Sequence, residues 1–389
     1  MSEPSRTRTS LVSLAGLFGL LVLGAVITTH AHAENAFSVD AVLTTEADTV
    51  LKGGLNRGTG ALSNLDLTAH WQGMNGWEAF GYVLADYGED MSANRVGDIQ
   101  VTSNIDCPDG LRLFEAYGKK TFGDKKSYLM GGLINLNGIF DVQEVGGLFL
   151  NASHGIGIDY SQAGPSIFPI TALGLVGEWQ AGERHSFRAG LFDGVPGDPD
   201  DPKKFVYIKL SAEEGAHLSG EYQYDYSGGY LKLGVWANTA KIERLDGSGT
   251  SRRNGGFYAQ TAFTLLEETP GSDQGLKGWV RAGVANDKLM TIDHYAGGGL
   301  VYTGALKRHD TDQMGIAVAV AHFGTPYQAS QSAILKKEIT YEVSYRWDFK
   351  DGLSIQPDLQ YIEHPYGRSD VGNATVFNLR IKTGLSAFR

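Results

Sequence analysis

Cysteine is almost absent from this chain, because Cys107 is the only one among 389 residues. A single cysteine excludes an intramolecular disulfide, and no cysteine and histidine residues have the spacing of a zinc site. The formal net charge is −11, whereas a surface that binds nucleic acid needs clustered lysine and arginine. We therefore expect no nucleic-acid partner, no metal site and no cofactor.

Long hydrophobic runs are absent after residue 33. The one apolar run, Leu11 to Val26, follows a polar start that contains Arg6 and Arg8. It ends shortly before Ala31-His32-Ala33, which supplies the small residues that a signal peptidase requires. The run is too short for a transmembrane helix of ~20 residues. We expect residues 1–33 to be a removed signal peptide and residues 34–389 to form one exported domain; an uncleaved anchor is the alternative.

Proline is scarce, with 11 residues, whereas the chain contains 52 glycines, 18 tyrosines, 17 phenylalanines and 6 tryptophans. A transmembrane β-barrel alternates lipid-facing and lumen-facing residues, so its hydropathy is close to average, and it uses aromatic residues at both membrane interfaces. A large secreted β-sandwich or β-propeller would have the same composition. The composition therefore predicts an all-β protein without deciding between these classes.

Apolar and polar residues alternate in many short segments. The clearest are Asn64–Trp71, His217–Tyr226, Thr340–Phe349 and Leu353–Tyr361. Alternation alone does not separate a sandwich from a barrel, because both have one apolar face. Tyrosine and tryptophan at the ends of the apolar faces favour a barrel, since a bilayer interface would place them there; they are Trp71, Tyr341, Trp347 and Tyr361.

Roughly sixteen strand-like segments lie between Phe37 and Phe388, and an even count is typical of a bacterial barrel. Short turns such as Gly228-Gly229 alternate with long connections. The long ones are Gly88–Gly110, Asn137–Ile170, Asp246–Asn254 and Gly324–Ser332. The predicted fold is a transmembrane antiparallel β-barrel of about 16 strands with long extracellular loops.

The segment Leu148–Gly174 has neither strand nor helix periodicity. It nevertheless contains three aromatic residues and two prolines, which is unlike a disordered linker; they are Phe149, Tyr160, Phe168, Pro165 and Pro169. Unstructured loops of this length are uncommon and are usually functional. We expect it to fold into the barrel as a constriction loop, and an ordinary solvent-facing loop is the alternative.

The same segment carries a resemblance to a family. FLNASHGIGIDYSQAGPSIFPITALG resembles the signature segment of the carbohydrate-selective outer-membrane porins of the OprB type. Similar phrases occur in the family's order, namely VGDIQVTSNIDCPDGLRLFE, GLFDGVPGDPDDP, GLVYTGALKRHDTDQMG, YEVSYRWDF and LSIQPDLQYI. The resemblance implies an outer-membrane porin, monomeric or homo-oligomeric and surrounded by outer-membrane lipid. Its solutes would be monosaccharides such as glucose, which cross by facilitated diffusion.

Sugar recognition in such a channel needs paired hydrogen-bonding groups, and arginine and carboxylates form the strongest hydrogen bonds. The candidate constriction residues are Arg57, Arg112, Glu115, Asp141, Glu144, Asn151, Ser153 and His154. Salt bridges that pin the loop to the barrel wall are the alternative role for each.

No enzymatic arrangement is evident. Ser153 and His154 are sequence neighbours within a loop, and the chain has no GxSxG motif. We expect a channel and no enzyme. A general diffusion porin, a barrel enzyme and a soluble secreted binding domain remain alternatives.

Overall fold

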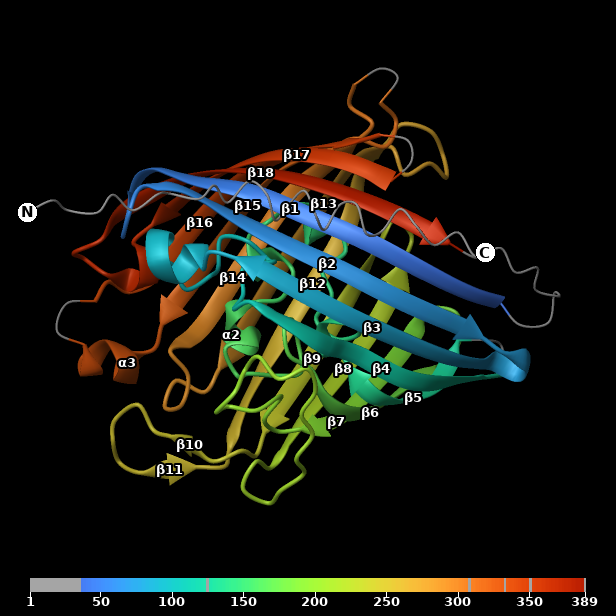
Figure 1. The fold of residues 1–389 in the computed structure, drawn as a ribbon, viewed down its shortest axis with the longest axis horizontal. Coiled ribbons are helices and arrows are strands. Elements are labelled where there is room, and N and C mark those ends of the chain that lie inside the picture. Colours follow the sequence, from blue (N-terminus) through green and yellow to red (C-terminus); the bar gives the residue numbers. More distant parts are fainter. Residues whose placement is uncertain (1–35, 124–125, 307–308, 332–333, 350–351, 388–389) are drawn as a thin grey trace, which may run out of the picture.

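The computed structural model describes residues 36–123, 126–306, 309–331, 334–349 and 352–387. Sixteen antiparallel strands in this part of the chain form one closed barrel (Figure 1). The barrel strands are β1 (Ala36–Gly54), β2 (Gly58–Gln72), β3 (Trp77–Gly88), β4 (Gly110–Phe122), β5 (Ser127–Ile134), β6 (Ala172–Gln180), β7 (His185–Asp193), β8 (Ala216–Tyr226), β9 (Gly229–Asn238), β12 (Asn254–Glu267), β13 (Gly275–Ala285), β14 (Ile292–Thr303), β15 (Gln313–Phe323), β16 (Lys337–Asp348), β17 (Leu353–Glu363) and β18 (Gly372–Ala387). Each strand pairs with its successor, and β18 pairs with β1, so no edge remains unpaired.

The predicted barrel and its strand count are confirmed. The expected signal peptide lies outside the described residues. Two features were not evident from the sequence. β14 begins at Ile292, although Gly297, Gly298 and Gly299 interrupt its apolar and polar alternation. A hairpin of β10 (Ile242–Glu243) and β11 (Thr250–Ser251) lies in the loop after β9, where no strand was predicted.

The two faces of the strands have the predicted character. In β16, Val343 is 55% exposed on the outside, whereas its neighbours Glu342 and Ser344 are 1% and 2% exposed inside the barrel. Trp71, Tyr341, Trp347 and Tyr361 are all exposed on the outer face. A barrel with an apolar exterior and a polar interior is suited to a lipid bilayer.

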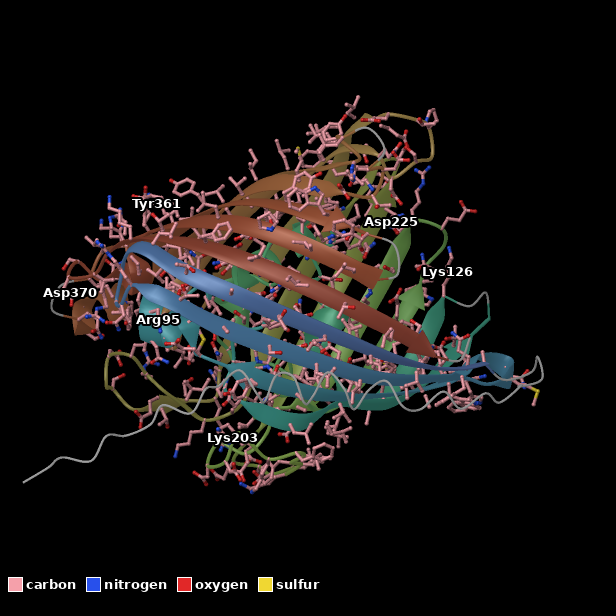
Figure 2. The ribbon with its side chains drawn as sticks, turned by 45° about the horizontal axis from the view of Figure 1, so that its top comes forward. Arg95, Lys126, Lys203, Asp225, Tyr361 and Asp370 are labelled. Atoms are coloured by element: carbon pink, nitrogen blue, oxygen red, sulfur yellow. The ribbon has the colours of Figure 1, made fainter. Side chains whose placement is uncertain are left out.

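Long loops gather at one end of the barrel and short turns at the other. Figure 2 shows Arg95 and Asp370 at the loop end, with Lys126 and Asp225 at the turn end. The turn end carries connections such as residues 181–184 and 227–228, and the loop end carries residues 89–109, 135–171 and 194–215. This is the asymmetry expected of periplasmic turns and extracellular loops.

The helices are short. Among the described residues, no helix combines the length and apolar character needed to cross a membrane. Residues 135–171 contain η4 (Leu136–Gly138), η5 (Gly146–Leu148), η6 (Ala152–His154) and α2 (Ile158–Ser161). The other short helices are η2 (Met74–Gly76), η3 (Ser92–Val96), α3 (Thr325–Ser330) and η8 (Pro365–Gly367).

Candidate channel constriction

Residues 135–171, here called the first inward loop, connect β5 to β6 through the interior of the barrel (Figure 1). Two asparagines start its helical turns: the side chain of Asn135 accepts from the amide of Asn137, and that of Asn151 accepts from the amide of Ser153. The segment predicted as strand-free, Leu148–Gly174, extends slightly too far, because β6 starts at Ala172. The helical turns make the loop compact. Backbone amides and carbonyls that are not used within these turns bond to side chains of several strands.

Arg281 of β13 holds the first inward loop at two points. Its Nη2 lies 2.7 Å from Oδ2 of Asp141, and its Nη1 also pairs with Asp159 in α2. All three side chains are at most 2% exposed. The rings of Tyr258 and Tyr295 flank the guanidinium, with centroids 5.3 and 5.1 Å from its central carbon. Burial raises the pKa of Asp141 to about 6 even though Arg281 opposes the shift.

The middle of the first inward loop is held by the far wall of the barrel. Glu342 of β16 accepts from the amides of Leu150 and Asn151. Gln356 of β17 donates to the carbonyl of Leu148 at 2.6 Å. Carboxylates that accept backbone N–H groups form strong, directional bonds in a buried setting. The loop therefore crosses the lumen and does not project into solvent.

His154 lies in an aromatic site of this loop. Its ring centroid lies 5.2 Å from that of Phe149 and 5.6 Å from that of Trp279. Nε2 lies 3.3 Å from Oε2 of Glu342, but among the described residues neither ring nitrogen makes a hydrogen bond. Burial lowers the pKa of His154 to about 3. The imidazole is therefore neutral and packs as an aromatic side chain.

A second inward loop, residues 89–109 between β3 and β4, lines the next part of the wall. Glu338 accepts from the amides of Ile99 and Gln100 at 2.9 and 3.0 Å. The two inward loops are joined directly, because Asn104 donates to the carbonyl of Leu150 at 2.8 Å and Ala152 donates to that of Val101 at 2.9 Å. The sequence predicted a long loop here but not its inward course.

Most side-chain hydrogen bonds of the two inward loops go to β8, β9, β12 to β14, β16 to β18 and β1. The first inward loop also packs Phe140 against Phe192 of β7, but other polar and aromatic side chains on the walls of β2 to β7 stay partly exposed. Arg188 of β7 is central among them: it donates to Glu178 at 2.8 Å, Glu221 at 2.6 Å and Gln223 at 2.9 Å. The other partly exposed side chains are Asp66, Tyr82, Glu115, Tyr117, Lys119 and Tyr128. Across the lumen, Glu144 of the first inward loop is 66% exposed, with Lys232 at 4.0 Å.

A sequence model of the carbohydrate-selective porin, OprB family, matches residues 63–385. The chain belongs to this family. The predicted family is thereby confirmed, and the family description is that of a channel and not of an enzyme.

Similar proteins agree with this assignment. A structure of OprB from Pseudomonas putida at high pH superimposes with a TM-score of 0.80 at 19% identity, covering 90% of this chain and 94% of that one. OmpF of Salmonella typhi superimposes with a TM-score of 0.60 at 12% identity, covering 90% and 98%. At such identities these matches establish the fold alone. Porin B of Pseudomonas aeruginosa is 23% identical over 205 residues, which span 45% of this chain and only 42% of that relative.

The structure separates the eight candidate residues into three groups. Arg57 is exposed in the turn between β1 and β2, where its carbonyl accepts from Arg95 of the second inward loop. Five candidates are buried: Arg112, Asp141, Asn151, Ser153 and His154. The first four form hydrogen bonds to protein partners, whereas the His154 ring packs against Phe149 and Trp279. Arg112, for example, pairs with Asp86 at 2.9 Å and donates to the carbonyl of Pro108. Their contacts correspond to the alternative role, pinning of loops to the wall. Only Glu115 and Glu144 are accessible from the lumen.

Several residues that build this porin's constriction were not among the candidates. Arg188, Arg281 and Glu342 lie within strands on the polar face, whereas Glu338 lies at the start of β16, before the predicted segment Thr340–Phe349. A charged residue within a predicted transmembrane strand is the signal that identifies the first three, because a lumen-facing charge there needs a partner or water.

Proposed function

We propose that this chain is an outer-membrane channel for the passive diffusion of small carbohydrates, with monosaccharides such as glucose as its preferred solutes. The family match over residues 63–385 supports this proposal most strongly. The inward loops add a physical basis, because they narrow an otherwise wide sixteen-stranded lumen. Export would require removal of residues 1–33.

The sugar would pass between the first inward loop and the walls of β2 to β7. Glu144 and Arg188 supply an acceptor and a forked donor for neighbouring hydroxyls. Tyr117 and Tyr128 supply ring faces for the apolar C–H side of a pyranose. Arg188, Tyr117 and Tyr128 are partly exposed and already paired or packed in the protein, whereas Glu144 is mostly exposed with only Lys232 at 4.0 Å. A sugar would therefore exchange protein partners and water for its own hydroxyls. Such binding is weak, which permits both entry and exit.

Liposome swelling tests this proposal. Vesicles that contain the purified barrel should swell faster in glucose than in a neutral amino acid of similar size. Glu144→Gln and Arg188→Lys should reduce this preference, because the first removes a charged acceptor and the second removes the guanidinium fork. Arg346→Lys is the matched control, since Arg346 pairs with Asp348 near the turn end of β16. Equal rates for sugars and amino acids would identify a general diffusion porin instead.

A further inference from the structure

A cluster of metal-ligating side chains lies on the outer side of the barrel, on strands β14 and β15. It consists of Asp293 and His294 of β14 and His322 of β15. One ligand atom from each lies within 4.8 Å of the others. Within the described part of the chain, this is the one group of three such residues that comes together so closely.

The backbone explains why these residues meet. His294 and His322 are directly opposite each other across the β14–β15 ladder, so both imidazoles stand on the same face. Asp293 would normally point to the opposite face, since side chains alternate along a strand. However, the register shifts between Ile292 and His294, and this bulge leaves Asp293 without a cross-strand partner. The bulge turns its carboxylate toward the two histidines, and bulges often redirect a side chain in this way.

The contacts within the cluster are already close to those of a metal site. Oδ1 of Asp293 lies 2.7 Å from Nδ1 of His322 and 2.9 Å from Nδ1 of His294. Ligand atoms of a tetrahedral Zn²⁺ at about 2.0–2.2 Å would be slightly further apart. A small outward rotation of the two imidazoles therefore makes room for an ion. The carboxylate is 11% exposed beneath the imidazoles, which are 64% and 39% exposed, so the ion would keep an outward coordination position for water.

We propose that Asp293, His294 and His322 bind a divalent first-row transition-metal ion, with Zn²⁺ the favoured case. Two imidazoles and one carboxylate suit Zn²⁺, Ni²⁺ or Cu²⁺, whereas Ca²⁺ and Mg²⁺ prefer oxygen ligands. The sequence did not indicate this site, because His294 and His322 are 28 positions apart and meet only when β14 pairs with β15.

The surroundings place the site at the outer rim of the barrel. His322 continues the outward-facing series of Ile316 and Val318 on β15, at the end next to the loops. Lys337 of β16 lies opposite His322 and opposes cation binding, but it is exposed and well screened. Asp287 lies near Asp293. Both are close to Gly324, where an added Cβ would lie 3.3 Å from the Cβ of Asp287 and 3.4 Å from that of Asp293. The net local charge thus remains favourable to a cation.

Calorimetric titration of the purified full-length mature barrel in detergent, without a histidine tag, tests the proposal. Zinc chloride alone should bind with one ion per chain. His294→Ala and His322→Ala should each weaken this binding at least tenfold, and millimolar Mg²⁺ or Ca²⁺ should not displace Zn²⁺. His309→Ala is the matched control, because His309 is also exposed and also lies 3.0 Å from a carboxylate, Asp312. It should leave the zinc affinity unchanged.

Two further measurements keep the result clear. The variants should keep wild-type single-channel conductance, which confirms that they are folded. Co²⁺ should give a visible absorption band in the wild type and in His309→Ala, and not in His322→Ala. Absence of saturable zinc binding, equal affinity in all variants, or displacement by Ca²⁺ would overturn the proposal.

Discussion

Arg281 makes more contacts with the first inward loop than a single ion pair requires. Its guanidinium bonds to Asp141 and Asp159 from two separate turns of the loop, and two tyrosine rings cover its faces. A buried charge without its partner is strongly destabilising, because no water replaces the lost bonds. The position of the loop therefore depends on a few buried charged residues of the wall.

Replacement of Arg281 by methionine should release the first inward loop. Asp141 and Asp159 would lose their cation, at a cost of about 3–5 kcal/mol for a broken buried pair. We expect higher and noisier single-channel conductance and faster proteolysis between residues 135 and 171. Arg346→Met removes a partly exposed pair at the turn end and should change neither property. Unchanged conductance in Arg281→Met would mean that other contacts suffice to hold the loop.

His154 should make loop docking sensitive to acid. Burial lowers the pKa of His154 to about 3 in the docked loop, and we expect the ordinary value of 6.5 once the loop is released. A lowered histidine pKa stabilises the docked state fully above pH 6.5 and less as the pH falls toward 3, by up to about 1.4 kcal/mol per pH unit.

Asp141 acts in the opposite direction. Burial raises the pKa of Asp141 from 3.8 to about 6. The docked loop therefore binds a proton more tightly than the released loop, and this stabilises docking as the pH falls from 6 toward 3.8. The difference between the wild type and His154→Leu isolates the histidine contribution. Conductance noise measured between pH 7 and 4 should rise in the wild type more than in the variant. Identical pH profiles would show that His154 does not titrate with docking.

At the scale of elements, strands were predictable and loop courses were not. Alternation in β16 predicted both faces correctly, because apolar residues recur at every second position and polar residues occupy the positions between them. The bond between Asp141 and Arg281 joins residues 140 positions apart, and no local pattern encodes such a partner. The loop's length and aromatic residues indicated an ordered segment, but only the closed barrel determines which strands it meets.

The face assignment of β16 gives a direct test. Val343→Arg places a charge on the lipid-facing side and should lower the free energy of unfolding in lipid by about 2–4 kcal/mol if the residue lies near the bilayer midplane. Thr68→Arg places the same side chain at a partly exposed lumen position of β2 and should leave stability nearly unchanged while altering conductance. Urea titration of both variants in lipid vesicles measures the difference. Equal losses would show the assigned faces to be wrong.

At the scale of the whole molecule, closure of β18 onto β1 removes every strand edge from the barrel. Closed barrels can reside in a bilayer because all their backbone groups are paired. We predict that the expressed protein is recovered in the outer-membrane fraction and that mass spectrometry finds Glu34 as its N-terminal residue. Recovery from the soluble periplasmic fraction would contradict the membrane location, and an intact residue 1 would contradict the cleavage.

Block of ion current by glucose tests the central proposal most directly. A single barrel in a planar bilayer should lose current in a saturable manner as glucose is added, because a sugar bound between the first inward loop and β2 to β7 obstructs the ions. Arg188→Lys should shift the half-blocking concentration upward by about tenfold, since a lost paired polar contact costs about 1–3 kcal/mol. A current that falls only in proportion to solution conductivity, without saturation, would contradict a sugar-binding constriction.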